Sequence, residues 1–138
     1  MPTTTDLLQK IYTAYREKRL DDVLALFSDD FRFTLHLPQG TIPGAGIPNN
    51  KAETAAMLQS FIDTYDFLDY DPDEIQISPD GEHATASPLI RYRHKASGQV
   101  IQTRLSHFWS VREGKARSLD EYHDTARVEA FLARVATQ

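Results

Sequence analysis

A pair of adjoining strand-like segments near the carboxyl end constrains the fold of this chain more than any other feature. They lie in residues 104–124, read as RLSHFWSVREGKARSLDEYHD. A Glu-Gly dipeptide at residues 113–114 separates them and suits the tight turn of a two-residue hairpin. Trp109 and Val111 precede the turn and Leu119 follows it, and such side chains favour a half-buried, pleated surface. The segment therefore predicts an antiparallel hairpin.

Titratable side chains are mixed into this hairpin, and they suggest that it lines a pocket. Because side chains alternate along a strand, Leu119, Glu121 and His123 share one face of the second strand. With the turn centred on residues 113–114, Ser106 lies opposite Glu121. That face then carries three further side chains, Arg104, Ser106 and Phe108. A register shifted by one residue places His107 and Trp109 there instead, because a single slip reverses every facing.

The remainder of the chain predicts helices first and strands afterwards. Apolar spacing and capping residues predict helices at residues 5–18, 21–27, 50–65 and 125–135. Alternating patterns predict strands at residues 31–35, 75–77, 84–94, 100–111 and 116–123. Three prolines and three glycines make residues 38–48 a loop, and the acidic residues 69–73 are expected to be connecting chain. This order predicts an α+β fold in one domain covering residues 1–138.

Composition narrows the classes of partner. The formal net charge of −5 argues against nucleic acid as a partner. The absence of cysteine excludes disulfides and thiolate metal sites. No apolar run approaches the roughly 20 residues that span a bilayer, and no signal peptide is recognised, so no membrane association and a cytoplasmic location are expected. The five histidines show no metal-binding spacing such as HExxH, and we expect neither a metal nor a cofactor.

Three strings in the chain resemble a known group of proteins. LDDVLALFSDDFRF, FWSVREGKA and EYHDTARVEAFL occur in the order found in the nuclear transport factor 2-like superfamily, and are most similar to its SnoaL-like and ketosteroid-isomerase-like branch. The resemblance implies a cone-shaped α+β barrel, in which a curved, mostly antiparallel sheet wraps around amino-terminal helices. It also implies a pocket at the wide end and a homodimer formed through the outer sheet face. Alignment around Gly114 favours the register with Ser106 opposite Glu121.

Glu121 is the leading candidate for chemistry. In a mostly apolar pocket its pKa is expected to rise towards the range useful for general acid–base catalysis. His123, or His107 in the shifted register, is then its hydrogen-bond partner or a second proton carrier. The competing interpretation is a Glu–Arg pair that only ties neighbouring strands together, and His123 as a ring at the pocket rim. Asp124 is expected to cap the last helix rather than act in catalysis.

The rest of the expected pocket comes from several elements. Arg91, Arg93 or Arg104 is a candidate partner for a substrate carboxylate or a developing oxyanion. The full set of expected ligand-pocket residues is Tyr15, Phe33, His36, Met57, Phe61, Arg91, Arg104, Ser106 and Phe108.

The chain departs from the best-defined catalytic sets of the family it resembles. Ketosteroid isomerases have a base carboxylate, a first-helix tyrosine and a second acid where this chain has residues 35–37, Ile11 and Ser106, so steroid isomerase chemistry is disfavoured. The epoxide hydrolase set of one arginine and two acids is met only in part. SnoaL-type cyclases need an acid and a histidine in an apolar cavity, and Glu121 with His107 or His123 is compatible with that.

Two classes of function follow. The first is a small-molecule pocket protein that acts as a lyase, isomerase or hydrolase on a hydrophobic, ring-containing substrate by general acid–base catalysis. The second is a noncatalytic ligand-binding or dimerisation domain, since a fold alone does not define an activity. The sequence leaves open whether the protein is an enzyme.

Overall fold

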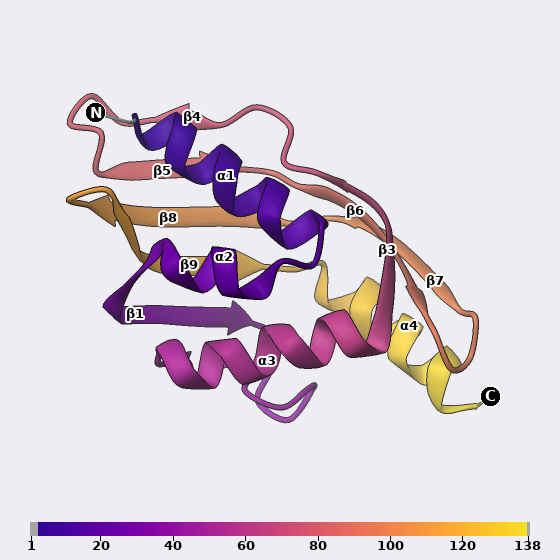
Figure 1. The fold of residues 1–138 in the computed structure, drawn as a ribbon. Helices are drawn as coiled ribbons and strands as arrows, with labels where there is room; N and C mark the ends of the chain where they lie inside the picture. Colours follow the sequence, from indigo (N-terminus) through magenta and orange to yellow (C-terminus); the bar gives the residue numbers. More distant parts are fainter. Residues whose placement is uncertain (1–2, 138) are drawn as a thin grey trace.

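The computed structural model describes residues 3–137 and combines helices with two sheets (Figure 1). The helices are α1 (Thr4–Arg16), α2 (Leu20–Ala25), α3 (Lys51–Thr64) and α4 (Thr125–Ala136). The strands are β1 (Phe27–His36), β2 (Pro48–Asn49), β3 (Tyr65–Asp71), β4 (Gln76–Ile77), β5 (His83–Ala86), β6 (Leu89–His94), β7 (Val100–Arg104), β8 (Ser106–Arg112) and β9 (Lys115–Tyr122). None of the described helices is both long and apolar enough to cross a membrane.

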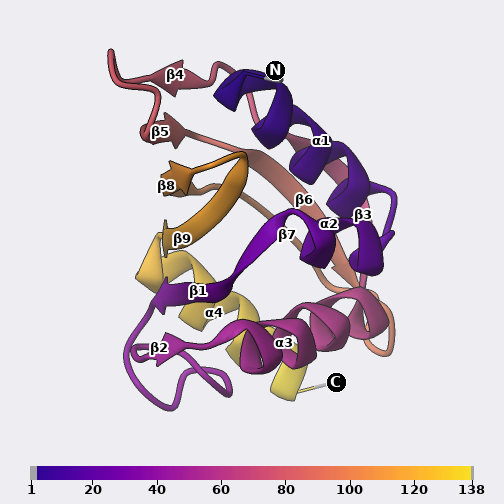
Figure 2. The same cartoon turned by 60° about the vertical axis from the view of Figure 1, so that its left-hand side comes forward.

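The strands form one large and one small sheet. The large sheet has the order β2-β1-β9-β8-β5-β4, and the small one has the order β3-β6-β7. Only β1 and β9 pair in parallel, and every other pair among the described strands is antiparallel. Figure 2 shows α1, α2 and α3 on one side of the large sheet. The predicted α+β fold with a curved, mostly antiparallel sheet is therefore confirmed.

The curvature has a local cause at two strand breaks that the sequence did not predict. Residues 84–94 and 100–111 were each expected to form one strand, but the first is interrupted at Ser87 and Pro88 and the second at Leu105. Ser87 Oγ donates a hydrogen bond to the Leu105 carbonyl at 3.0 Å, and the Leu105 N–H donates to the Pro88 carbonyl at 2.8 Å. Because proline lacks an N–H, the regular ladder cannot continue through it. The pairing of β5 with β8 therefore ends here, and the pairing of β6 with β7 begins on the other side of the break.

One predicted connection is a strand instead. Residues 69–73 were expected to be irregular because they are acidic, yet β3 extends to Asp71 and pairs with β6. The acidic residues of β3 are matched by arginines on β6, since Arg91 bonds Asp69 at 2.6 Å and Arg93 bonds Asp66 at 2.8 Å. Opposite charges on neighbouring strands stabilise such pairing. This is the strand-tying role considered for arginine, with Asp69 and Asp66 as the partners.

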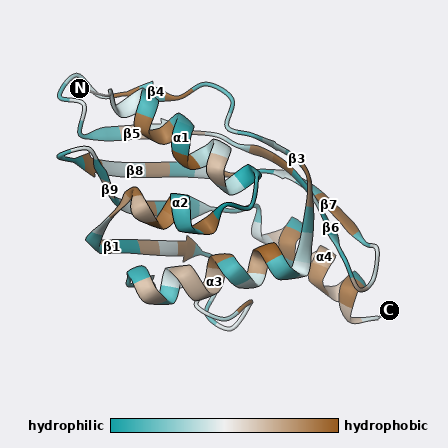
Figure 3. Ribbon diagram, in the orientation of Figure 1, coloured by the Kyte–Doolittle hydropathy of each residue, from teal (hydrophilic) through white to brown (hydrophobic). Residues whose placement is uncertain are grey.

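The helices begin and bury their faces as the sequence predicts. Asn50 and Glu53 form a capping box at the start of α3, and the Asp124 carboxylate accepts a hydrogen bond from the Arg127 N–H at 3.1 Å at the start of α4. Asp124 is therefore a helix cap. Figure 3 shows hydrophobic residues interspersed with hydrophilic ones along α1, α3 and α4, as expected of helices that cover a core on one face.

The hairpin forms, but in the register that was not preferred. Glu113 and Gly114 both have positive φ, at 54° and 74°, and Arg112 pairs with Lys115, as a two-residue turn requires. Beyond the turn β9 contains one unpaired residue, Arg117, because Val111 pairs with Ala116 whereas Ser110 pairs with Ser118. This β-bulge shifts all later pairs by one residue.

The consequence of the bulge is that His107, rather than Ser106, lies opposite Glu121. His107 and Trp109 therefore face the interior, with 2% and 3% of their surfaces exposed. The expected facing of Arg104, Ser106 and Phe108 towards the pocket is wrong for the same reason.

Candidate functional site

A cavity of about 120 Å³ lies in the interior and is lined by side chains from all four helices and from strands of both sheets. Its walls are mainly aromatic and aliphatic. Apart from tyrosine and tryptophan, five polar side chains reach it: Thr54, Thr103, His107, Glu121 and His123. An apolar cavity with a few convergent polar groups is the usual form of a small-molecule site.

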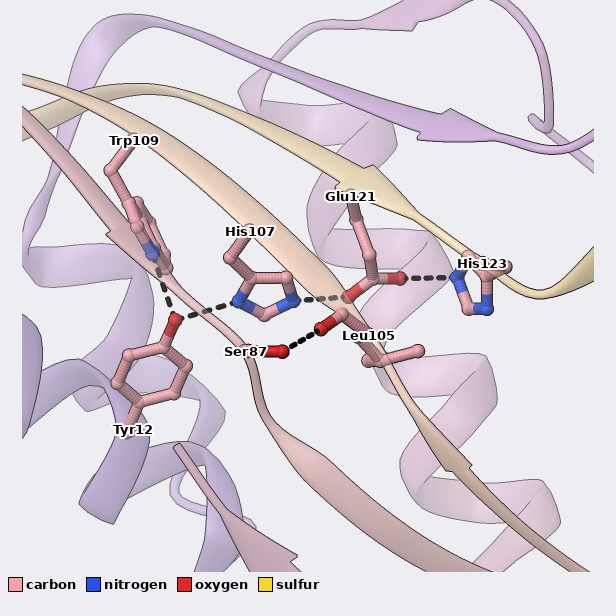
Figure 4. Close-up of polar contacts among 7 residues, drawn as sticks. All are labelled: Tyr12, Ser87, Leu105, His107, Trp109, Glu121 and His123. Atoms are coloured by element: carbon pink, nitrogen blue, oxygen red, sulfur yellow. Dashed lines mark hydrogen bonds and ion pairs between the residues drawn. The ribbon is translucent and has the colours of Figure 1, made fainter. Parts of the chain in front are cut away.

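The polar side chains form a continuous chain of hydrogen bonds along one wall (Figure 4). The Tyr12 hydroxyl lies 2.7 Å from His107 Nδ1, and His107 Nε2 lies 2.7 Å from Glu121 Oε1. His123 Nε2 lies 2.8 Å from the other carboxylate oxygen, Oε2. At the far end, Trp109 Nε1 donates to the Tyr12 hydroxyl at 2.9 Å. Each of the two carboxylate oxygens therefore has an imidazole partner.

Three elements and the segment that follows β9 supply the residues of this hydrogen-bond chain. Tyr12 lies on the buried face of α1, where the helical repeat also buries Leu8 and Tyr15. His107 and Trp109 follow at alternate positions of β8, and Glu121 lies opposite on β9. His123 follows the end of β9 and precedes the Asp124 cap of α4.

The hydrogen-bond network assigns the tautomer of His107. Burial raises the pKa of Tyr12, so its phenol keeps its proton. Since Tyr12 already accepts a hydrogen bond from Trp109, it donates its own proton to His107 Nδ1. His107 then carries its proton on Nε2 and donates it to Glu121. Each of the donors on Trp109, Tyr12 and His107 therefore has an acceptor.

The shift in the pKa of Glu121 is opposite to the one expected from its surroundings. Burial does raise the pKa of the carboxyl group, as predicted, and its side chain is only 13% exposed. The hydrogen bonds that His107 and His123 donate to the carboxylate outweigh burial, however, and hold the pKa of Glu121 well below its ordinary value. Glu121 is thus a carboxylate at neutral pH, and the expected rise of its pKa is wrong.

His123 has one ring nitrogen that the protein leaves without a partner. Its Nε2 is bonded to Glu121, whereas its Nδ1 is buried and has no hydrogen-bond partner among the described residues. Buried polar atoms are almost always hydrogen-bonded, so an exception in a cavity wall calls for an explanation.

The structure brings together six of the predicted site residues. The expected catalytic side chains Glu121, His123 and His107 all line the cavity. So do the predicted pocket residues Tyr15, Phe33 and Phe61.

The other predicted pocket residues lie elsewhere. Arg91 and Arg104 form ion pairs with Asp69 and Asp73, at 2.6 and 3.1 Å. Ser106 and Phe108 alternate with the buried residues of β8 and are exposed. Met57 is buried beside Gly44 of the loop at residues 38–47. The expected pocket positions of these residues are wrong because strand facing, and for Met57 helix facing, turns them away from the cavity.

His36 is also misplaced by the prediction. It was expected among the ligand-pocket residues, but its ring stacks on that of Tyr122 with centroids 4.0 Å apart, and its Nε2 lies 2.8 Å from Asp120 Oδ1. Asp120 and Tyr122 alternate with Glu121 along β9, so His36 lies on the opposite face of the sheet.

The sequence did not predict the hydrogen bonds of Tyr12 and Trp109. Ile11 was placed where a first-helix phenol was sought, and Trp109 was expected to face the pocket only in the shifted register. The phenol is supplied one residue later, by Tyr12. The signal that identifies both residues is burial: Tyr12 lies on the apolar stripe of α1, and Trp109 shares one face of its strand with Val111.

The described residues contain no group of three or more histidine, aspartate or glutamate side chains arranged to hold a metal ion. The histidine and glutamate side chains that line the cavity, His107, Glu121 and His123, hydrogen-bond to one another instead.

Comparison with models of protein families identifies the family of this chain. The model of the SnoaL-like domain matches residues 8–119, which is most of the chain. The protein belongs to the SnoaL-like domain family. Its fold is that of the nuclear transport factor 2-like superfamily, as the sequence predicted. None of the curated protein sequences is a significant match.

Solved structures share this fold at low sequence identity. A protein of unknown function from Burkholderia pseudomallei, described as NTF2-like, has a TM-score of 0.79 and 24% identity, and the match covers 95% of this SnoaL-like chain and 98% of the other. TerC, co-crystallised with polyporic acid, has a TM-score of 0.80, 15% identity and coverages of 94% and 98%. A candidate polyketide cyclase from Xanthomonas campestris has a TM-score of 0.74, 21% identity and coverages of 91% and 96%.

Proposed function

We propose that this SnoaL-like protein is an enzyme that performs general acid–base catalysis on a hydrophobic, ring-containing small molecule, as a lyase, an isomerase or a hydrolase. The observation that carries the proposal is the buried hydrogen-bond chain Tyr12–His107–Glu121–His123. It ends at His123, whose ring lines an apolar cavity and whose Nδ1 has no partner among the described residues.

In this proposal His123 transfers the proton, and Glu121 orients the imidazole ring of His123. The carboxylate holds His123 by its Nε2–H, which leaves the lone pair of Nδ1 free to accept a proton from the substrate. The imidazolium that forms is stabilised by the adjacent carboxylate, and the proton then returns to another atom of the substrate. His107, itself fixed by Tyr12, restrains the second carboxylate oxygen. Glu121 is therefore the orienting group, because its pKa is too low for a base.

The apolar wall supports this chemistry in two ways. It favours the binding of a hydrophobic ring by removing apolar surface from water. It also strengthens the interaction between the carboxylate and the imidazolium, since opposite charges attract more strongly where the dielectric constant is low. The co-crystal of TerC with polyporic acid supports small-molecule binding by proteins of this fold, and the candidate cyclase supports a catalytic role.

A noncatalytic ligand-binding domain is the alternative, and benzisoxazole separates the two. A base that removes the ring C–H proton of this compound breaks its N–O bond and yields a nitrile and a phenoxide, which solvent protonates to salicylonitrile. We expect the protein to accelerate this opening. Glu121→Gln should lower turnover at least about 100-fold, because the amide presents an N–H to one of the two histidines and forces the wrong tautomer.

The control is Asp120→Asn, which makes the matched change on the outer face of the same strand and should leave turnover within about twofold. Binding of the probe should be similar in both variants. No acceleration by the wild type, or equal turnover in folded wild type and Glu121→Gln, contradicts the enzyme proposal and favours the noncatalytic domain.

We further propose a homodimer through the outer face of the large sheet. Phe108 and Tyr122 are 47% and 45% exposed on this face and contact each other edge to face at 5.5 Å. Exposed aromatic side chains of this kind favour burial in an interface. Sedimentation analysis should show a dimer, and Phe108→Glu should shift it to monomer. A wild type that sediments as a monomer at high concentration contradicts the proposal.

A further inference from the structure

We infer that the ligand of the cavity is an uncharged ring compound that donates a hydroxyl hydrogen bond to His123 Nδ1, and is neither a carboxylate nor a phosphate. The inference rests on the proposed function, because it names the class of substrate for the same cavity. It follows from the size of the cavity, from its charge and from the state of the polar atoms in the hydrogen-bond chain.

The size of the cavity suits one ring. Its volume is about 120 Å³. An apolar protein cavity of about 150 Å³ is known to bind benzene and to stay dry otherwise. A single six-membered ring with a small substituent is therefore the scale of molecule that fills this space.

The charge of the lining excludes anions. None of the described residues that line the cavity is lysine or arginine, and Glu121 is the acidic residue among them. Arg91 and Arg104, which were considered as anion partners, are committed to Asp69 and Asp73 outside the cavity. A carboxylate or phosphate would be buried beside the Glu121 carboxylate without a counter-ion, which is strongly unfavourable.

The polar atoms of the chain leave one position for the ligand. Both Glu121 oxygens accept hydrogen bonds from histidines, and both His107 nitrogens are engaged. Among residues 3–137, His123 Nδ1 is the buried side-chain atom that has no hydrogen-bond partner. With Nε2–H donated to Glu121, a neutral His123 presents an acceptor at Nδ1. The complementary ligand group is a donor, and a hydroxyl on a ring supplies it without bringing a charge.

Phenol, toluene and benzoate test this inference by calorimetric titration. Phenol and toluene fill similar volumes, but only phenol donates a hydrogen bond, and benzoate adds the negative charge. We expect phenol to bind and benzoate to bind at least about tenfold more weakly than phenol. His123→Leu should lower phenol affinity about tenfold while leaving toluene affinity within about twofold. The matched control is His83→Leu, which changes an exposed histidine of β5 and should alter neither affinity.

Nitrogen NMR of histidine-labelled wild type provides a readout that needs no variant to fold. Saturation with phenol should shift the Nδ1 resonance of His123, whereas toluene should leave it within error. Three results would overturn the inference: benzoate binding as tightly as phenol, an Nδ1 resonance that phenol leaves unchanged, or tetramethylammonium binding more tightly than phenol. The outcome is separate from that of the proposed function, since a protein that opens benzisoxazole but binds benzoate best refutes the ligand class alone.

Discussion

Two histidine–carboxylate pairs lie on opposite faces of the large sheet, with similar hydrogen-bond lengths but different surroundings. His107 and Glu121 are 2.7 Å apart on the inner face, with 2% and 13% of their side chains exposed. His36 and Asp120 are 2.8 Å apart on the outer face, with 32% and 44% exposed. The two carboxylates are neighbours in sequence, and the pleat of β9 sends them to opposite sides.

The difference shows that the surroundings, rather than the pair itself, decide what a histidine–carboxylate contact does. Outside, water and salt screen the pair, and its contribution to stability is small. Inside, the same contact is part of a buried chain with a tyrosine, a tryptophan and a second histidine, and it moves the pKa of Glu121. Paired substitutions on the two faces test this comparison.

The largest effect on stability is expected from removing the two carboxylates in turn. Glu121→Ala should lower the free energy of unfolding by about 3–5 kcal/mol, because it leaves two buried imidazoles without their acceptor. Asp120→Ala should lower it by less than about 1 kcal/mol. Urea unfolding of the two variants measures both values. Equal losses would show that the buried chain has no special role in stability.

The pH dependence of stability sharpens the comparison next. The pKa of Glu121 is held below the ordinary value of 4.5, so its carboxylate adds stability above that pH and loses the contribution as the pH falls through its folded-state value. The stability advantage of wild type over Glu121→Gln should therefore be greatest near pH 7 and shrink by about pH 3. Unfolding curves at several pH values measure it. An advantage that grows on acidification would mean that the pKa is raised.

A smaller effect is expected from the two tyrosines that accompany the pairs. Tyr12→Phe removes the acceptor of Trp109 and the donor to His107, and should cost about 1–3 kcal/mol. Tyr122→Phe, on the exposed outer face, should cost less than about 0.5 kcal/mol. Thermal unfolding of both variants measures the two losses of stability. Similar small losses would show that the Tyr12 hydroxyl is solvated or replaceable.

Much of the fold could be predicted because its signals are local. The caps formed by Asn50 and Asp124 follow from side-chain chemistry next to an apolar helix. The turn at residues 113–114 follows from Gly114, which adopts a positive φ without strain. Alternation along the chain also predicts that Leu119, Glu121 and His123 share one face, and all three line the cavity.

The features that the sequence did not predict depend on contacts between residues far apart in the chain. The bulge at Arg117 changes the register without a local signal in β9, and only the apolar alternation of Trp109 and Val111 in the partner strand indicated the correct facing. The direction of the Glu121 pKa shift depends on donors from two other positions, which burial alone does not reveal. The strand β3 was missed because the arginines that balance its acidic residues lie on β6.

The central claim is that the inner face carries out proton transfer through His123 and that the outer histidine does not. The most direct measurement is the rate of benzisoxazole opening by His123→Gln and His36→Gln, each folded and saturated with the probe. We predict a loss of about 100-fold or more for His123→Gln, as for removal of a general base, and a change within about twofold for His36→Gln. Equal rates in wild type and His123→Gln would contradict the claim.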